Sequence, residues 1–149
     1  MRLVLQRVSK AEVTVAGQRV GSIGSGLVVL LGVGPADTAS DISWLVKKCV
    51  ELRIFEDGDG KMNRSVQDVG GSILLVPQFT LYGRCNRGRR PDFTQAASPE
   101  VAEGMYQSFG RALEATGIPV EYGVFGAHMK LSLTNDGPVT ILLERTDGH

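Results

Sequence analysis

The fold is decided by the run Leu27-Val28-Val29-Leu30-Leu31, which is closed by Gly32-Val33-Gly34-Pro35. Five consecutive apolar residues followed by turn residues are typical of a strand that is buried on both faces. The sequence therefore predicts a buried strand over residues 27–31.

The segment before this run predicts a hairpin. Residues 11–15 alternate apolar and polar side chains, which is the period of a half-buried strand. Gly17-Gln18 can turn the chain, and residues 20–23 then supply the second strand of the hairpin.

Two segments have the spacing of amphipathic helices. Asp37 or Ser40 can cap the first helix. The second begins at Ser98-Pro99, a cap residue followed by a proline in the first turn, and ends before Gly117. Their apolar faces consist of Ile42, Leu45, Val46, Cys49 and Leu52 in the first helix and Ala102, Met105, Tyr106, Phe109 and Leu113 in the second.

Four further strands are predicted over residues 53–55, 72–82, 129–133 and 139–143. The resulting order is β-β-β-α-β-β-α-β-β. This order predicts an α/β fold with mostly antiparallel strands and two packed helices. A length of 149 residues suits a single domain over residues 1–149.

The overall charge argues against a general nucleic-acid coat protein. Lys and Arg number 16 and so do Asp and Glu, which gives a net charge of zero, although a local basic patch is compatible with that balance. Cys49 and Cys85 form no disulfide framework or zinc motif. The sequence has no signal peptide and no run of transmembrane length, so we expect a cytoplasmic protein without a membrane partner, metal or cofactor.

A polar motif follows the apolar part of the predicted strand 72–82. Within a strand, Gln78 and Thr80 would project from one face and Phe79 from the other. Gln78 and Thr80 could together bind a polar substrate, and Thr80 could attack a carbonyl if a base activated it. The alternative is that these are ordinary strand residues, and the residues alone favour that alternative.

An arginine-rich loop comes next. Its four arginines fall within seven positions: Arg84, Arg87, Arg89 and Arg90. Guanidinium groups match phosphate geometry, so this loop could hold an RNA backbone. A solvated loop whose arginines pair with acidic neighbours is an equally good interpretation.

The third motif is Asn135-Asp136-Gly137-Pro138-Val139-Thr140, whose simplest interpretation is a hairpin turn. A Gly-Pro backbone could also present its carbonyl oxygens to a ligand at close range. A nucleophile–histidine site would have to use His128, because His149 is the last residue. We interpret His128 as a solvent-facing strand residue.

Several motifs in this order resemble the D-aminoacyl-tRNA deacylase family, once called D-tyrosyl-tRNA deacylases. The resemblance covers nearly the whole chain. Its motifs are Gln6-Arg7-Val8, Arg53-Ile54-Phe55, Gly60-Lys61-Met62-Asn63, Gly70-Gly71-Ser72, Gln78-Phe79-Thr80-Leu81, Arg87-Gly88, Arg90-Pro91 with Phe93, Ala97-Ser98-Pro99, Phe125-Gly126-Ala127 with Met129, and residues 135–140.

The resemblance implies a barrel-like sheet with two helices and a homodimer with active sites at the subunit interface. It implies a hydrolase that cleaves D-aminoacyl-tRNA, and mischarged glycyl-tRNA, for proofreading in translation. The catalytic motif would be Gln78, Phe79 and Thr80. A cis Gly137-Pro138 from one subunit would enter the partner's site, where with Met129 and Asn135 it would exclude L-amino acids. The arginine loop would bind tRNA, and no DNA partner is implied.

Two mechanisms are compatible with this resemblance. Thr80 could attack the ester, or water could attack with help from the substrate's 2′-hydroxyl while backbone amides near Phe79 and Thr80 stabilise the oxyanion. We favour the second mechanism because the sequence offers no base to activate Thr80. Pro77 departs from the family motif, which usually has a serine there, and proline has neither a hydroxyl nor an amide proton.

Two non-catalytic hypotheses remain open from the residues alone. One is an RNA-binding module that uses the arginine loop, although few aromatic residues are evident for base stacking. The other is a structural interaction domain in which all three motifs are turns and strands. Within the family resemblance, Phe79 and the unbroken run 135–140 imply the D-specific branch rather than the related enzymes with altered motifs and relaxed chirality toward L-alanine.

Overall fold

The sheet is built around β1 (Arg2–Val15), the first long strand of the computed structural model, which describes residues 1–146. Three strands pair with β1, all of them antiparallel to it: β2 (Gln18–Ile23), β3 (Gly26–Gly32) and β8 (Lys130–Glu144). β3 continues the sheet through two parallel ladders, first to β6 (Ser72–Pro77) and then from β6 to β7 (Val120–Tyr122). The sheet is therefore mixed, with three antiparallel ladders and two parallel ladders.

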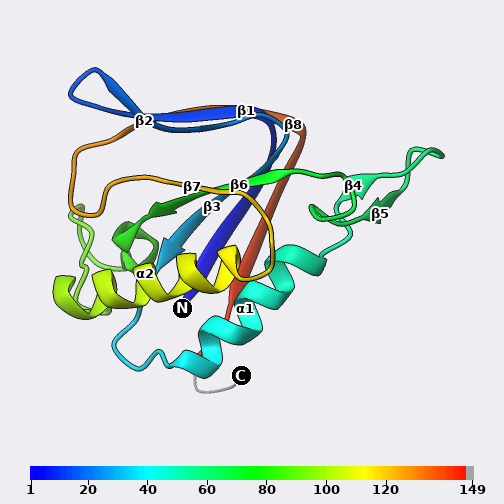
Figure 1. Cartoon of the computed structure of the whole chain (residues 1–149). Helices are drawn as coiled ribbons and strands as arrows, with labels where there is room; N and C mark the ends of the chain where they lie inside the picture. The colour runs from blue at the N-terminus through cyan, green and yellow to red at the C-terminus, as the bar shows by residue number, and fades with distance from the viewer. Residues whose placement is uncertain (147–149) are drawn as a thin grey trace.

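The two helices lie on the same side of this curved sheet (Figure 1). They are α1 (Ala39–Glu51) and α2 (Pro99–Glu114), and they pack against each other as well as against the strands. A small two-stranded unit, β4 (Phe55–Glu56) with β5 (Met62–Arg64), extends away from the body (Figure 1). The predicted α/β fold with two packed helices is confirmed.

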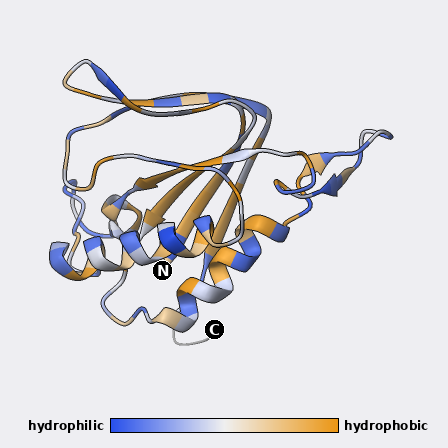
Figure 2. Ribbon diagram, viewed as in Figure 1, coloured by the Kyte–Doolittle hydropathy of each residue, from blue (hydrophilic) through white to orange (hydrophobic). Residues whose placement is uncertain are grey.

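The core explains why residues 27–31 form an unbroken apolar run. Leu27 and Val29 belong to the main cluster between the sheet and the helices, whereas Val28 belongs to a second cluster on the opposite side of the sheet. All three are fully buried. Figure 2 shows the central strands as hydrophobic throughout, whereas the helices alternate between hydrophobic and hydrophilic residues. The predicted strand buried on both faces is confirmed.

The N-cap of α1 differs from the prediction. The cap is Thr38 rather than Asp37 or Ser40, and the carboxylate of Asp41 accepts a hydrogen bond from the Thr38 amide at 2.9 Å. Asp37 is engaged elsewhere, because its carboxylate accepts from the Gly34 amide at 2.6 Å and from the amino group of Met1 at 2.5 Å. The cap of α2 at Ser98 agrees with the prediction.

The strand predicted over residues 72–82 is too long. β6 ends at Pro77, and residues Phe79–Tyr82 form a 3₁₀ turn, η1. Leu81 donates its amide to Gln78 O at 3.3 Å and Gly83 donates to Thr80 O at 3.0 Å, so the backbone bonds to itself rather than to a neighbouring strand. The expectation that Gln78 and Thr80 share a strand face is therefore wrong.

The hairpin turn predicted within residues 135–140 is also wrong. β8 is one strand, and both of its halves pair with β1, through Lys10↔Thr134 before the motif and Gln6↔Thr140 after it. The residues between bulge out of the ladder. The side chain of Asn135 closes this bulge, since its Oδ1 accepts from Val139 N at 2.7 Å and its Nδ2 donates to Val139 O at 3.1 Å.

Three smaller elements also differ from the prediction. β4 begins two residues later than the predicted strand 53–55, and β5 and β7 were not predicted. β5 and β7 have only three residues each, too few for a periodic pattern to be recognised. Among residues 1–146, no helix is long and apolar enough to cross a membrane.

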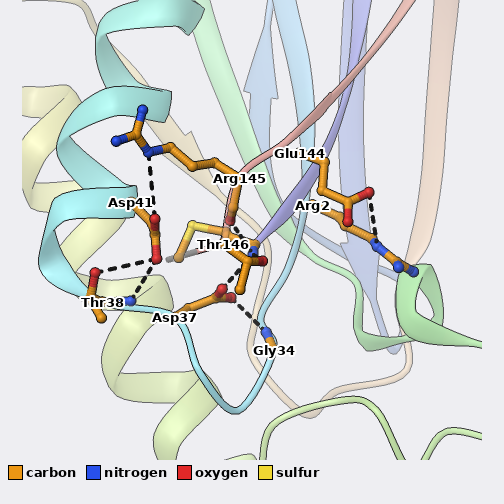
Figure 3. A network of polar contacts seen from close by, with 9 residues as sticks. Arg2, Gly34, Asp37, Thr38, Asp41, Glu144, Arg145 and Thr146 are labelled. Atoms are coloured by element: carbon orange, nitrogen blue, oxygen red, sulfur yellow. Dashed lines mark hydrogen bonds and ion pairs between the residues drawn. The ribbon is translucent and has the colours of Figure 1, made fainter. Parts of the chain in front are cut away.

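A buried polar network joins the two ends of the described chain to α1 (Figure 3). The amino group of Met1 forms an ion pair with Asp37, and both side chains are almost fully buried. The same amino group donates to the carbonyl of Arg145 at 2.7 Å, while the Arg145 side chain forms an ion pair with Asp41 at 3.5 Å. The network therefore ties the start of β1, the entrance to α1 and the end of β8 together.

Candidate functional site

The end of β6 opens into a pocket of about 550 Å³. Its lining is mostly apolar and comes from the end of β6, the segment before α2 and the segment that joins β7 to β8: Val76, Pro77, Gln78, Phe79, Phe93, Ala96, Ala97, Pro99, Ala102, Phe125, Gly126, Ala127, His128, Met129 and Leu131. A few polar groups at the edge of an apolar concavity are typical of small-ligand sites.

The polar motif lies at the edge of this pocket. Gln78 and Thr80 are brought together by the 3₁₀ turn, and the Gln78 side-chain amide donates to the Thr80 hydroxyl. Leu81 donates the first hydrogen bond of the turn, so the amides of Phe79 and Thr80 that precede it have no intrahelical acceptor. This part of the chain can therefore offer a side-chain amide and two backbone amides to a ligand oxygen.

Pro77 fits its position without losing a sheet hydrogen bond. Gln78 N donates to Leu31 O at 2.8 Å and Ser72 N donates to Ser25 O, so the even-numbered amides of β6 face β3. An amide at position 77 would face the β7 side, where the ladder ends at Leu75↔Tyr122. Proline is tolerated here because that direction points beyond the last β7 partner.

Aromatic rings line the pocket beside the polar motif. Phe79 is 57% exposed and makes an edge-to-face contact with Phe93, with ring centroids 5.2 Å apart. Phe125 contributes from the segment after β7. His128 is exposed, as expected, but it precedes β8 instead of lying in a strand, and it lines this pocket. His149 lies outside the described residues.

The Gly137-Pro138 segment is not part of this pocket. Both residues are exposed, and neither belongs to the lining. Their strand, β8, contributes to the lining at its start, through Leu131, whereas Gly137 and Pro138 lie further along the strand. The peptide between them is cis, as the resemblance implies. Of the other two residues expected for chiral selection, Met129 lines the pocket and Asn135 does not.

The buried side chain of Arg7 fixes the backbone of the Gly137-Pro138 segment through a hydrogen bond. Its side chain is only 6% exposed, its Nε donates to Asp136 O and its Nη1 donates to Ile54 O, both at 2.8 Å. Gly137 has a φ of 143°, and a Cβ atom there would lie 2.8 Å from Val139 Cγ2 and 3.0 Å from Arg7 Nη2. Only glycine therefore fits this backbone without displacing its neighbours.

The alternation of side chains along β1 indicates a buried position for Arg7, although the sequence analysis did not identify it. Leu3 and Leu5 are buried on β1, and strand alternation puts Arg7 on the same face. An arginine at an inward-facing position must find hydrogen-bond acceptors, which here are two backbone carbonyls. The pocket residues Phe93 and Phe125 carried no comparable signal, because their segments have no regular period.

The arginine loop is closed by a pair of residues at its ends. Arg84 and Asp92 form a backbone bridge and an ion pair at 3.1 Å. Hydrogen bonds from Thr94, together with Arg84, lower the pKa of the Asp92 carboxyl to about 2, so it stays ionised. Arg87, Arg89 and Arg90 are exposed, and within residues 1–146 none of them has an ion pair.

Metal binding has no obvious site within the described part of the chain. No group of three or more His, Cys, Asp or Glu side chains among these residues could hold a metal ion. Cys49 is fully buried in α1, and burial raises the pKa of its thiol to about 12. Cys85 is exposed in the arginine loop.

Comparisons with known proteins identify a group of similar chains. A family model described as D-Tyr-tRNA(Tyr) deacylase matches residues 4–144. A protein of Desulfitobacterium hafniense named D-aminoacyl-tRNA deacylase is 57% identical over 144 residues, which cover 97% of each chain. A protein of the same name from Thermus aquaticus is 54% identical over 147 residues, covering 99% of this chain and 97% of the relative.

Solved structures share the fold. One titled c-Myc DNA Unwinding Element Binding Protein superposes with a TM-score of 0.91 at 46% identity, covering 97% of this chain and 99% of that chain. Another, titled as a probable eukaryotic D-amino acid tRNA deacylase, has a TM-score of 0.82 at 20% identity and covers 95% and 97% of the two chains. The second similarity, at this identity, concerns the fold alone.

Proposed function

The chain belongs to the D-aminoacyl-tRNA deacylase family, and from this premise we propose that it hydrolyses the ester that joins a D-amino acid to the terminal adenosine of tRNA. The observation that supports this proposal most directly is the pocket at the end of β6. Its lining is apolar and includes Phe79 and Gln78, and beside it lies Thr80, whose backbone amide, like that of Phe79, has no acceptor within the turn. These are the groups that an ester hydrolase needs to stabilise a developing oxyanion.

Water is the proposed nucleophile. The described structure offers Thr80 no base, because its hydroxyl accepts from the Gln78 amide, which is a donor and cannot take up a proton. Water would add to the ester carbonyl carbon, with the 2′-hydroxyl of the terminal ribose assisting the proton transfer. The bond between the carbonyl carbon and the ribose ester oxygen would then break, that oxygen would take up the proton lost by water, and free D-amino acid and tRNA would leave.

The chiral selection is proposed to need a second copy of the chain. In one chain the Gly137-Pro138 segment lies outside the pocket, exposed on β8 and fixed by Arg7. A homodimer with the active site at the subunit interface would allow this segment to enter the partner's pocket. There its backbone would contact the α-amino group and leave no room for an L side chain, whereas glycine, which has no side chain, would still enter.

The exposed arginines are proposed to bind the tRNA backbone. Arg87, Arg89 and Arg90 follow closely on the catalytic motif in the chain and have no ion pair among residues 1–146. Arg84 would instead keep the loop closed through Asp92. Such a contact suits proofreading of aminoacyl-tRNA in the cytoplasm, where translation takes place.

The test is the release of tyrosine from D-Tyr-tRNA and L-Tyr-tRNA by the purified protein in the presence of a chelator. We expect rapid release from the D form only. Release from both forms would contradict the proposed chiral selection. Release from neither form would contradict the hydrolase, and tRNA binding without turnover would then favour the RNA-binding module.

A further inference from the structure

A buried tyrosine on α2, Tyr106, bonds to β6 and to the segment that follows β7, both of which contribute residues to the pocket. Tyr106 is 6% exposed, and its hydroxyl donates to Leu75 O at 2.9 Å. A second acceptor, Gly123 O, lies 3.4 Å from the same hydroxyl. Burial raises the pKa of Tyr106 above its usual value, so the group stays a neutral donor.

These two acceptors belong to different parts of the site. Leu75 lies in β6 directly before Val76, the first residue of β6 that lines the pocket, and we call this part of β6 the floor of the pocket. Gly123 directly follows β7 and begins the segment 123–129, which we call the wall segment, because Phe125 to Met129 line the pocket. The Tyr106 hydroxyl therefore connects the wall segment to the floor.

Besides the Tyr106 hydroxyl, the wall segment is attached to the body of the protein by a backbone hydrogen bond at Gly123 and by the apolar packing of Phe125 and Met129. Gly123 N donates to Leu75 O at 2.9 Å, and the Phe125 ring lies 6.1 Å from the Tyr106 ring. Within the segment, Val124 N donates to Met129 Sδ at 3.4 Å. The space at Gly123 is tight, since a Cβ atom there would lie 2.8 Å from Met129 Sδ. A small displacement at Gly123 would therefore move Met129 and the pocket lining with it.

Packing alone does not require a hydroxyl at this position. A phenylalanine would fill the same space, and a buried hydroxyl is costly unless it is hydrogen-bonded. The hydroxyl of Tyr106 instead supplies a second donor to Leu75 O, which already accepts from Gly123 N. The arrangement fixes the point where the wall segment leaves the sheet.

We propose that Tyr106 is a positioning residue that holds the wall segment in place and thereby sets the affinity of the pocket for the aminoacyl-adenosine end of the substrate. This inference rests on the proposed function for its substrate. Tyr106 does not line the pocket, so its effect is exerted through Gly123, Phe125 and Met129.

The test compares Tyr106→Phe with Tyr122→Phe. Tyr122 makes an edge-to-face contact with Tyr106, but it is only partly buried and does not line the pocket. For D-Tyr-tRNA, Tyr106→Phe should raise KM about five- to ten-fold, the effect of one hydrogen bond, with kcat within about two-fold of wild type. Tyr122→Phe should leave KM and kcat unchanged although it also removes a tyrosine hydroxyl.

Amide hydrogen exchange supplies a readout that does not depend on activity. In Tyr106→Phe, exchange over residues 123–129 should be about ten-fold faster than in wild type, and in Tyr122→Phe it should be unchanged. Unchanged KM together with unchanged exchange in Tyr106→Phe would overturn the inference, as would equal effects in both variants. If wild type hydrolyses no aminoacyl-tRNA, the proposed function fails, and the exchange comparison alone decides the role of Tyr106.

Discussion

Replacing Gly137 by alanine should disable the site while leaving the fold intact. Gly137 has a φ of 143°, a region that side-chain-bearing residues rarely adopt. The added Cβ would lie 2.8 Å from Val139 Cγ2 and 3.0 Å from Arg7 Nη2. Arg7 is buried and held by two carbonyls, so it has little freedom to move away.

The size of the effect follows from where the strain can relax. A residue forced into this backbone region costs about 1–3 kcal/mol. Residues 136–139 lie outside the β1–β8 ladder, which resumes at Thr140 and Asn135. The bulge can therefore shift without breaking the strand, so the free energy of unfolding should fall by less than about 1 kcal/mol. Activity that requires the native bulge should fall about 5- to 150-fold, the equivalent of 1–3 kcal/mol.

The assay measures kcat/KM for D-Tyr-tRNA and L-Tyr-tRNA, together with the urea midpoint of unfolding. Gly24→Ala is the matched control, because a Cβ there meets no atom within 4 Å and its φ is not positive. Wild-type kcat/KM and unchanged D-over-L discrimination in Gly137→Ala would refute the proposed role of the bulge. A large loss of stability would instead show that the bulge is part of the folding core.

Four further outcomes test other parts of the molecule. Thr80→Ala should keep kcat within about 10-fold of wild type because Thr80 is not the proposed nucleophile, whereas removal of a true nucleophile costs several orders of magnitude. Single-turnover release from D-Tyr-tRNA measures this. Near-complete loss of release with normal tRNA binding would implicate the Thr80 hydroxyl. Asp37→Asn should destabilise the protein by about 3 kcal/mol, because it leaves the buried amino group of Met1 without its counter-charge. A lower urea midpoint of unfolding at an unchanged m-value would support this, and an unchanged midpoint would contradict it. Gly104→Ala should stabilise the protein by about 0.5–1 kcal/mol, since Gly104 lies in the middle of α2, is exposed to solvent and has open space where a Cβ would be added. Thermal unfolding measures this, and a lower Tm would contradict the prediction. Arg90→Ala should weaken tRNA binding and reduce by about 1 the slope of log affinity against log salt concentration. Binding titrations at several salt concentrations measure this slope. An unchanged affinity and slope would show that Arg90 makes no phosphate contact.

The elements that the sequence predicted well are those whose side chains follow a regular period. The apolar run 27–31 predicted the buried strand, and the amphipathic spacing of α1 and α2 identified both helices. Two predictions were wrong where a side chain forms the hydrogen bonds that a backbone group would otherwise make. Asn135 bonds to both backbone groups of Val139, which keeps β8 continuous where turn chemistry predicted a hairpin. Thr38 and Asp41 likewise cap α1 where Asp37 or Ser40 was expected.

The candidate site was predicted in part. Gln78, Phe79 and Met129 line the pocket, and Thr80 lies beside it through its bond to Gln78. The geometry expected for Gln78 and Thr80 was wrong, because the strand gives way to a 3₁₀ turn after Pro77. Phe93 and Phe125 were named only as parts of family motifs, since they come from irregular segments that meet at the end of β6.

The sequence by itself determined the class of the fold, both helices, the buried strand and the residues of the polar motif. These depend on local periodicity and on chemistry that each residue carries wherever it lies. Only the tertiary structure decided that residues 135–139 bulge over Arg7, that Tyr106 joins α2 to the pocket wall, and that the buried amino group of Met1 meets Asp37. Those contacts join residues that are far apart in the chain, and their partners are chosen by the packing of the whole sheet rather than by any local pattern.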